Sequence, residues 1–110
     1  MSAHPRVKVA VAQFNATLGD LAGNTRKIVD FARRAYAQGA RVLLTPELSL
    51  CGYPPEDLLL RPAFMRACTQ ALSECAAQLA DLQGMHVVVG HPHQLGERGD
   101  VRTKSGAVPL

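Results

Sequence analysis

The sequence contains no tryptophan, and its aromatic residues are limited to three phenylalanines and two tyrosines. Proteins that bind single-stranded nucleic acid stack bases on aromatic rings beside a basic groove. The twelve basic residues of this chain are interleaved with nine acidic ones, so no basic stripe forms. The sequence therefore gives no support to a nucleic-acid partner.

Cysteine is also scarce. Cys51, Cys68 and Cys75 are odd in number and show no C-x-x-C spacing, which argues against a disulfide framework and against a zinc site. His91 and His93 flank a proline, but two histidines at this spacing have no third ligand close in the sequence. We expect free thiols and no bound metal.

Long hydrophobic runs are absent, because no stretch approaches the ~20 apolar residues that a membrane helix requires. The polar segment Met1–Arg6 lacks the pattern of a signal peptide. We therefore expect no membrane association and a cytoplasmic location. Apolar residues make up 47% of the 110 positions, which is enough for one hydrophobic core and leaves no room for a second domain.

Hydrophobic patterns typical of strands and helices alternate along the chain. Valines in Arg6–Phe14 recur at every second position, as in a strand. In Thr25–Gln38 the apolar residues follow three- and four-residue steps, which predicts a helix with Asn24 as its N-cap and Gly39 at its C-terminal end. The short apolar segment Arg41–Thr45 then predicts a buried strand.

The second half of the chain continues this alternation. A long helix is predicted to begin at Pro62 and to end before Gly84, followed by a third strand at Met85–Val89. Beyond it the pattern weakens until a possible strand at Gly106–Leu110, and we expect residues 95–110 to form a poorly defined tail. The order of elements predicts an α/β fold with a mostly parallel sheet and helices on its faces.

Glu47 follows the second predicted strand directly after a proline. In open α/β sheets the reactive groups gather in loops at the carboxyl ends of the strands. A carboxylate in such a loop is partly desolvated and can take a proton from a nucleophile and return it to a leaving group. Position alone leaves a second interpretation open, in which Glu47 is a turn carboxylate bonded to nearby backbone N–H groups.

A family resemblance extends over Thr45–Phe64, which reads TPELSLCGYPPEDLLLRPAF. This segment resembles a signature of the nitrilase superfamily of carbon-nitrogen hydrolases. Its GYPPEDLL run, Gly52–Leu59, is similar to the glutaminase domain of glutamine-dependent NAD synthetases in particular. Three further segments agree: VAVAQFNATLGDLAGN, GARVLLTPE and VVVGHPHQ. The resemblance covers about Val7 to Gln94.

The resemblance implies an α-β-β-α sandwich, here incomplete, with helices packed on one face of the sheet. It also implies a Glu, Lys, Cys triad in which Glu47 is the general base and then the general acid, while a cysteine attacks the side-chain amide of glutamine. The lysine stabilises the oxyanion, and the released ammonia passes to a synthetase domain that uses ATP and magnesium. Tyr53 could line the substrate pocket or simply pack in its loop. Full-length relatives are expected to form homo-oligomers.

The sequence departs from the family pattern at its end, because we find neither the lysine segment nor the nucleophile segment. Lys104 lies in a context that does not resemble the family's lysine, and we assign it no role. Cys51 could replace the nucleophile, but Glu47, Glu56 and Asp57 would oppose its ionisation, so we expect a packing role.

We therefore expect residues 1–110 to be the N-terminal portion of one carbon-nitrogen hydrolase domain, inactive alone. Two alternatives stay open. One is a non-catalytic remnant or subunit of the same fold. The other is a stand-alone amidase of the superfamily that acts on some other amide.

Overall fold

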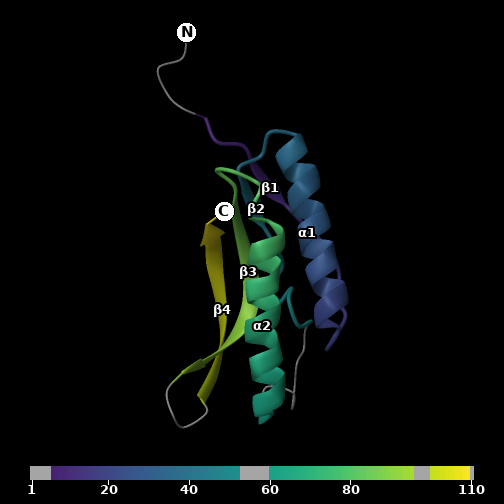
Figure 1. The fold of residues 1–110 in the computed structure, drawn as a ribbon, viewed down its shortest axis with the longest axis vertical. Coiled ribbons are helices and arrows are strands. Elements are labelled where there is room, and N and C mark those ends of the chain that lie inside the picture. Colours follow the sequence, from purple (N-terminus) through teal and green to yellow (C-terminus); the bar gives the residue numbers. More distant parts are fainter. Residues whose placement is uncertain (1–5, 53–59, 96–99, 110) are drawn as a thin grey trace.

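The computed structural model of the protein describes residues 6–52, 60–95 and 100–109 (Figure 1). Strands and helices alternate and then end in a hairpin. In chain order the elements are β1 (Val9–Val11), α1 (Leu21–Ala37), β2 (Val42–Leu44), α2 (Pro62–Gln78), β3 (His86–Leu95) and β4 (Asp100–Pro109). The predicted α/β class is confirmed.

The four strands form one sheet in the order β1-β2-β3-β4. The first three are parallel, with Val9 opposite Val42 and Val42 opposite His86. β4 is antiparallel to β3, from His86 opposite Pro109 to Leu95 opposite Asp100. The sheet is therefore mostly parallel, as the sequence predicts.

Within residues 95–110, where the sequence predicts a poorly defined tail, the described residues 100–109 form β4. β3 continues past its predicted end at Val89 to Leu95, and β4 begins at Asp100, well before the predicted Gly106. Antiparallel strands pair through backbone hydrogen bonds, and this pairing does not require the alternating apolar pattern that the segment lacks.

β1 is shorter than the predicted strand Arg6–Phe14. Its last ladder bond is followed by a hydrogen bond from the N–H of Ala12 to the carbonyl of Leu44, at 2.8 Å. Beyond Ala12 the chain leaves the sheet toward α1, since its partner β2 also ends at Leu44. Both carboxyl ends therefore lie side by side.

α1 begins earlier than predicted. Its N-cap is Asp20, whose Oδ1 accepts a hydrogen bond from the N–H of Gly23 at 3.0 Å. The expectation that Asn24 caps the helix was wrong, because Asp20 already satisfies the first turn and places Asn24 inside the helix. The side chain of Asn24 is therefore not needed as a cap and can form hydrogen bonds elsewhere.

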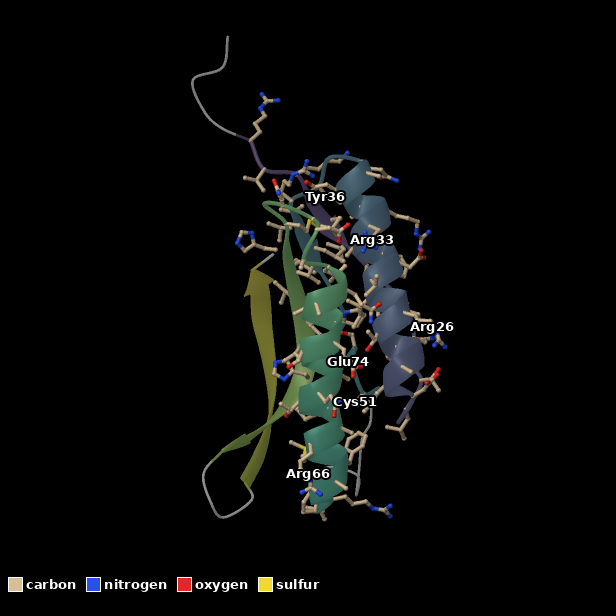
Figure 2. The ribbon with its side chains drawn as sticks, viewed as in Figure 1. Arg26, Arg33, Tyr36, Cys51, Arg66 and Glu74 are labelled. Carbon is tan, nitrogen blue, oxygen red and sulfur yellow. The ribbon has the colours of Figure 1, made fainter. Side chains whose placement is uncertain are left out.

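Both helices pack on the same face of the sheet, as the resemblance implies. The core between them consists of buried side chains from α1, α2, the strands and the loop after β2: Ala12, Ile28, Ala32, Leu43, Leu48, Leu50, Cys51, Cys68, Ala71, Cys75, Leu79, Leu82, Met85, Val87 and Val89. Charged side chains such as Arg26, Arg66 and Glu74 are exposed on the outside of the helices (Figure 2). Neither α1 nor α2 has the length and apolar character of a membrane-spanning helix.

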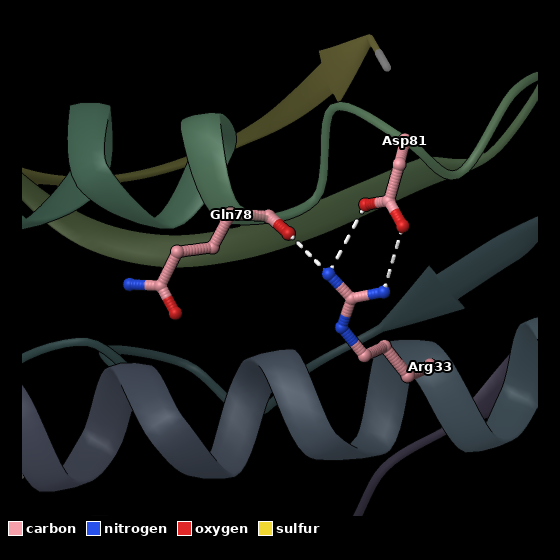
Figure 3. Close-up of polar contacts among 3 residues, drawn as sticks. All are labelled: Arg33, Gln78 and Asp81. Carbon is pink, nitrogen blue, oxygen red and sulfur yellow. Dashed lines mark hydrogen bonds and ion pairs between the residues drawn. The ribbon is translucent and has the colours of Figure 1, made fainter.

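A clasp joins the two helices near their C-terminal ends (Figure 3). The guanidinium group of Arg33 on α1 donates to both carboxylate oxygens of Asp81, at 2.9 and 3.0 Å, and to the carbonyl of Gln78 at 2.6 Å. This ion pair raises the pKa of Arg33 and lowers that of Asp81. Because both side chains are well exposed, solvent screens the ion pair and we expect the clasp to add little stability.

The opposite face of the sheet carries apolar side chains that the described residues leave exposed. Val9 and Val11 of β1 are 52% and 63% exposed, and Leu44 of β2 is 39% exposed. Leu43, whose side chain points to the helices, is 1% exposed. We call Val9, Val11 and Leu44 the open sheet face.

Candidate active site

Two loops leave the adjacent carboxyl ends of β1 and β2. The first loop comprises Ala12–Asp20, and the glutamate loop comprises Thr45–Gly52. An open cavity of about 520 Å³ lies between them, lined by residues 11–15 together with Thr45 and Pro46. A neighbouring cavity of about 330 Å³ is lined by residues 14–16, Pro46 and Glu47. Glu47 thus stands at a cavity at the strand ends, where the sequence predicts reactive groups.

The side chain of Glu47 is exposed in the described structure, so the expected partial burial is not found. The physical reason is that β2 ends at Leu44 and Glu47 opens a turn that projects beyond the sheet. The backbone N–H groups that donate to side chains in the described residues bond Asn24 and Asp20 instead of Glu47. The interpretation of Glu47 as a bonded turn carboxylate therefore gains no support.

The glutamate loop is held to β3 by polar contacts at its start. The hydroxyl of Thr45 donates to the carbonyl of Val88 at 2.6 Å and lies 2.8 Å from the hydroxyl of Ser49. Farther along, the N–H of Leu50 donates to the carbonyl of Gly90 at 3.2 Å. The loop is therefore anchored on both sides of Glu47.

Leu48, the residue after Glu47, has a left-handed backbone with φ of 52°. This conformation costs a non-glycine residue on the order of 1–3 kcal/mol, and such strain tends to collect at functional sites. The side chain of Leu48 is 1% exposed, and its burial in the core offsets the strain. The turn therefore has a defined shape directly beside the carboxylate.

Gly90 allows the glutamate loop to approach β3 closely. A Cβ atom at this position would stand 2.4 Å from the N of Leu48 and 2.8 Å from the carbonyl oxygen of Pro46. Both contacts involve backbone atoms, which cannot move aside as a flexible side chain can. A glycine is required here, and sequence patterns gave no signal of that requirement.

Cys51 is fully buried, which supports the predicted packing role. Its Sγ donates to the carbonyl of Gly52 at 3.4 Å. Interaction with the neighbouring thiol of Cys68 lowers the pKa of Cys51, and interaction with Cys51 together with burial raises the pKa of Cys68. Burial raises the pKa of Cys75 to about 11. With all three thiols inside the core, none is placed to attack a substrate in the cavities.

The remaining residues singled out from the sequence are Tyr53 and the histidines after the third predicted strand. Tyr53 lies outside the described residues, as does most of the GYPPEDLL run. His91 is half-buried, with Nδ1 3.1 Å from the carbonyl of Pro92. Within the described part of the chain, no three His, Cys, Asp or Glu side chains are grouped as metal ligands.

Comparisons with known proteins agree with the geometry. The sequence model of the family described as carbon-nitrogen hydrolase matches residues 8–106. The chain is 46% identical over 90 residues to the glutamine-dependent NAD(+) synthetase of Synechocystis sp., a match that covers 82% of this chain and 16% of the synthetase. The chain therefore spans about one sixth of the length of this relative.

Solved structures give the same result. A glutamine-dependent NAD(+) synthetase from Cytophaga hutchinsonii superposes with a TM-score of 0.83 at 25% identity, covering 94% of this chain and 17% of that one. An amidase from Nesterenkonia sp. superposes with a TM-score of 0.66 at 28% identity, covering 90% of this chain and 42% of that one.

Proposed function

The chain belongs to the carbon-nitrogen hydrolase family, and we propose that it contributes the general base, Glu47, to a glutaminase that supplies ammonia for NAD synthesis. The observation that carries the proposal is the position of Glu47 at a cavity between the ends of two parallel strands. The similarity to glutamine-dependent NAD synthetases, which extends over most of the chain, supports this choice of substrate.

In the proposed reaction Glu47 takes the proton of a cysteine thiol, and the thiolate attacks the side-chain amide carbon of glutamine. Glu47 then gives that proton to the leaving nitrogen, so ammonia departs and a glutamyl thioester remains. Water, deprotonated by Glu47, hydrolyses the thioester to glutamate and restores the thiol.

The nucleophile and the oxyanion-stabilising lysine come from outside this chain in our proposal. The burial of Cys51, Cys68 and Cys75 supports a nucleophile from elsewhere. The exposure of Glu47 supports the same view, because a general base works best where water is largely excluded and further segments would have to cover it. ATP and magnesium would act in the synthetase part, and we expect the whole protein to be a cytoplasmic homo-oligomer.

The test is a chimera in which this chain replaces the segment of the Synechocystis synthetase that it matches. NAD formation is measured with glutamine and, separately, with ammonium chloride as nitrogen donor. We expect the chimera to use both donors. Glu47→Gln should lower the glutamine-dependent kcat by at least about 100-fold, the usual contribution of a general acid and base, and should leave the ammonia-dependent rate unchanged.

Glu74→Gln is the matched control, since Glu74 is exposed on α2 away from the loops. It should change neither rate. A chimera that works with ammonia but not with glutamine would favour a non-catalytic remnant. Full glutamine-dependent activity in Glu47→Gln would refute the assignment of the general base.

A second candidate, an amidase acting on another amide, is favoured by the superposition on the Nesterenkonia amidase. The same chimera distinguishes it. Hydrolysis of small aliphatic amides at a higher kcat/KM than that of glutamine would support this candidate over the first.

A further inference from the structure

Asn24 is a polar residue with no exposed surface. Its side-chain amide donates to the carbonyl of Thr17 at 2.8 Å and to the carbonyl of Leu50 at 3.0 Å. Its Oδ1 accepts from the N–H of Thr17 at 2.8 Å. Both N–H groups of the amide and its oxygen are thus used, and every partner is a backbone group of a loop.

These partners belong to the two loops that line the cavities. Thr17 lies in the first loop, and Leu50 lies in the glutamate loop, in the same turn as Glu47. The amide of Asn24, in the first turns of α1, therefore bridges the two loops.

Two further contacts show that the loops meet directly. The N–H of Gly19 donates to the carbonyl of Cys51 at 2.8 Å. Gly52 has φ of +88°, and a Cβ there would stand 2.6 Å from the Cα of Leu18. The first loop, the glutamate loop and the start of α1 form one unit, with the Asn24 amide at its centre.

The chemistry of this position requires an amide. Two carbonyl oxygens face the side chain, so an aspartate would place negative charge against them and could donate to neither. An apolar residue of similar size would take away the partner of the N–H of Thr17 and of the buried carbonyl of Leu50, which is costly. The carbonyl of Thr17 would keep its bond from the N–H of Asp20 at 3.1 Å.

We propose that Asn24 is a positioning residue of the active site, holding the Glu47 turn in register with the first loop. The inference rests on the proposed function of Glu47 as general base. Thr45 and Ser49 fix the turn from the side of β2 and β3, whereas Asn24 fixes it from the side of α1. Loss of the bridge should displace the carboxylate from the reacting groups without removing any contact to the substrate.

The kinetic test uses the synthetase chimera with Asn24→Asp. A misplacement of about 1 Å can lower a rate on the order of 100-fold, so we expect the glutamine-dependent kcat to fall at least about tenfold. The KM for glutamine should change less than about twofold, because a group that acts in the transition state affects kcat first. The ammonia-dependent rate should stay at the parent value.

Thr25→Val is the matched control. Thr25 is the next residue of α1, is 5% exposed, and its hydroxyl has no hydrogen-bond partner among the described residues. This change removes a buried polar group from the same turn without breaking a bridge. It should leave both rates unchanged.

Hydrogen exchange gives a readout that does not depend on activity. In Asn24→Asp, peptides covering the first loop and the glutamate loop should exchange faster, while peptides from β3 should keep the parent rate. Gly52→Ala places a Cβ against the backbone of Leu18 and so separates the same loops. It should reproduce both the kinetic and the exchange pattern if Asn24→Asp does not fold.

The outcomes separate the two claims. If Glu47→Gln is inactive with glutamine and Asn24→Asp is as active as the parent, the positioning role of Asn24 is refuted and the role of Glu47 as general base is supported. If Asn24→Asp lowers the glutamine-dependent and ammonia-dependent rates together and speeds exchange throughout, Asn24 is merely structural. If Glu47→Gln stays active, the proposed function falls, and with it the inference.

Discussion

Single residues around Glu47 determine how the carboxylate is presented. Leu48 holds a strained backbone and Gly90 leaves space for that backbone against β3. The two features depend on each other, because the left-handed turn places the N of Leu48 where a side chain at position 90 would stand.

Gly90→Ala is therefore expected to displace the glutamate loop. In the synthetase chimera it should lower the glutamine-dependent kcat at least about tenfold, since small displacements of catalytic groups are costly, and should spare the ammonia-dependent rate. Gly39→Ala adds the same Cβ where it meets no atom within 4 Å, so at φ +92° it strains the local backbone without pushing on a loop. Equal glutamine-dependent rates in the two variants would contradict the steric argument.

Cys75 provides a pH-dependent prediction. Burial raises its pKa from 9.0 to about 11, so the folded state holds the thiol proton more tightly than the unfolded state does. The contribution of the buried, protonated thiol to the stability of the fold is complete below pH 9 and is lost as pH rises toward 11. The loss amounts to about 2 to 3 kcal/mol in the free energy of unfolding.

Urea unfolding of the chain at several pH values measures this loss. Cys75→Val keeps a side chain of similar size and cannot ionise, so its free energy of unfolding should decline less between pH 9 and pH 11. Parallel declines in the parent and the variant would show that the thiol of Cys75 is not the titrating group.

The residues of the site differ in how far the sequence predicts them. The sequence predicts a role for Glu47 because its neighbours form a recognisable signature. The bridge made by Asn24 was missed because capping is a local rule, whereas its bond to Leu50 joins residues far apart in the chain. Gly90 was missed for the same reason, since its constraint comes from a loop that packs on it only after folding.

At the scale of elements, local rules succeeded for the helices and were less successful for the strands. The apolar spacing of both helices matches their buried faces, with Ile28 and Ala32 on α1 and Cys68 and Cys75 on α2 in the core. Strand ends depend on the length of the partner strand, which a single segment does not encode. β1 therefore ended early, and β3 extended beyond its apolar run to pair with β4.

The start of α1 gives a prediction for this scale. Asp20→Ala removes the hydrogen bond to the N–H of Gly23 and should lower the free energy of unfolding by about 1 kcal/mol, the usual value of an N-cap. Urea unfolding monitored by circular dichroism measures the change.

Asp30→Ala is the control for the loss of a carboxylate from the same helix. Asp30 pairs with Arg34 on the surface, at 3.0 Å, and an exposed pair of this kind contributes about 0.3–0.5 kcal/mol. If Asp30→Ala costs as much as Asp20→Ala, then charge and not capping explains the effect.

At the scale of the whole molecule, the open sheet face distinguishes the described residues from a globular domain whose sheet is covered on both faces. Val11 and Leu44 are neighbours in the sheet register, and both are exposed and apolar. Exposed apolar surface of this kind favours association. The resemblance accounts for this face, because the implied sandwich has a second layer there.

Replacing Val11 and Leu44 together by lysine should shift the isolated chain toward the monomer, because two adjacent positive charges oppose face-to-face contact. Sedimentation velocity over a range of concentrations measures the shift. Arg66→Lys on the outer side of α2 serves as a control and should leave the distribution unchanged. A parent chain that is monomeric at all concentrations would contradict the expectation.

The parallel arrangement of the first three strands also sets an order of events during synthesis. β2 lies between β1 and β3, yet β3 is translated only after the whole of α2. When β2 has just left the ribosome, one of its edges can already pair with β1. Its other edge stays unpaired until β3 has emerged as far as residue 90. Pausing of translation within α2 would therefore prolong the period in which β2 has an unpaired edge that chaperones can bind.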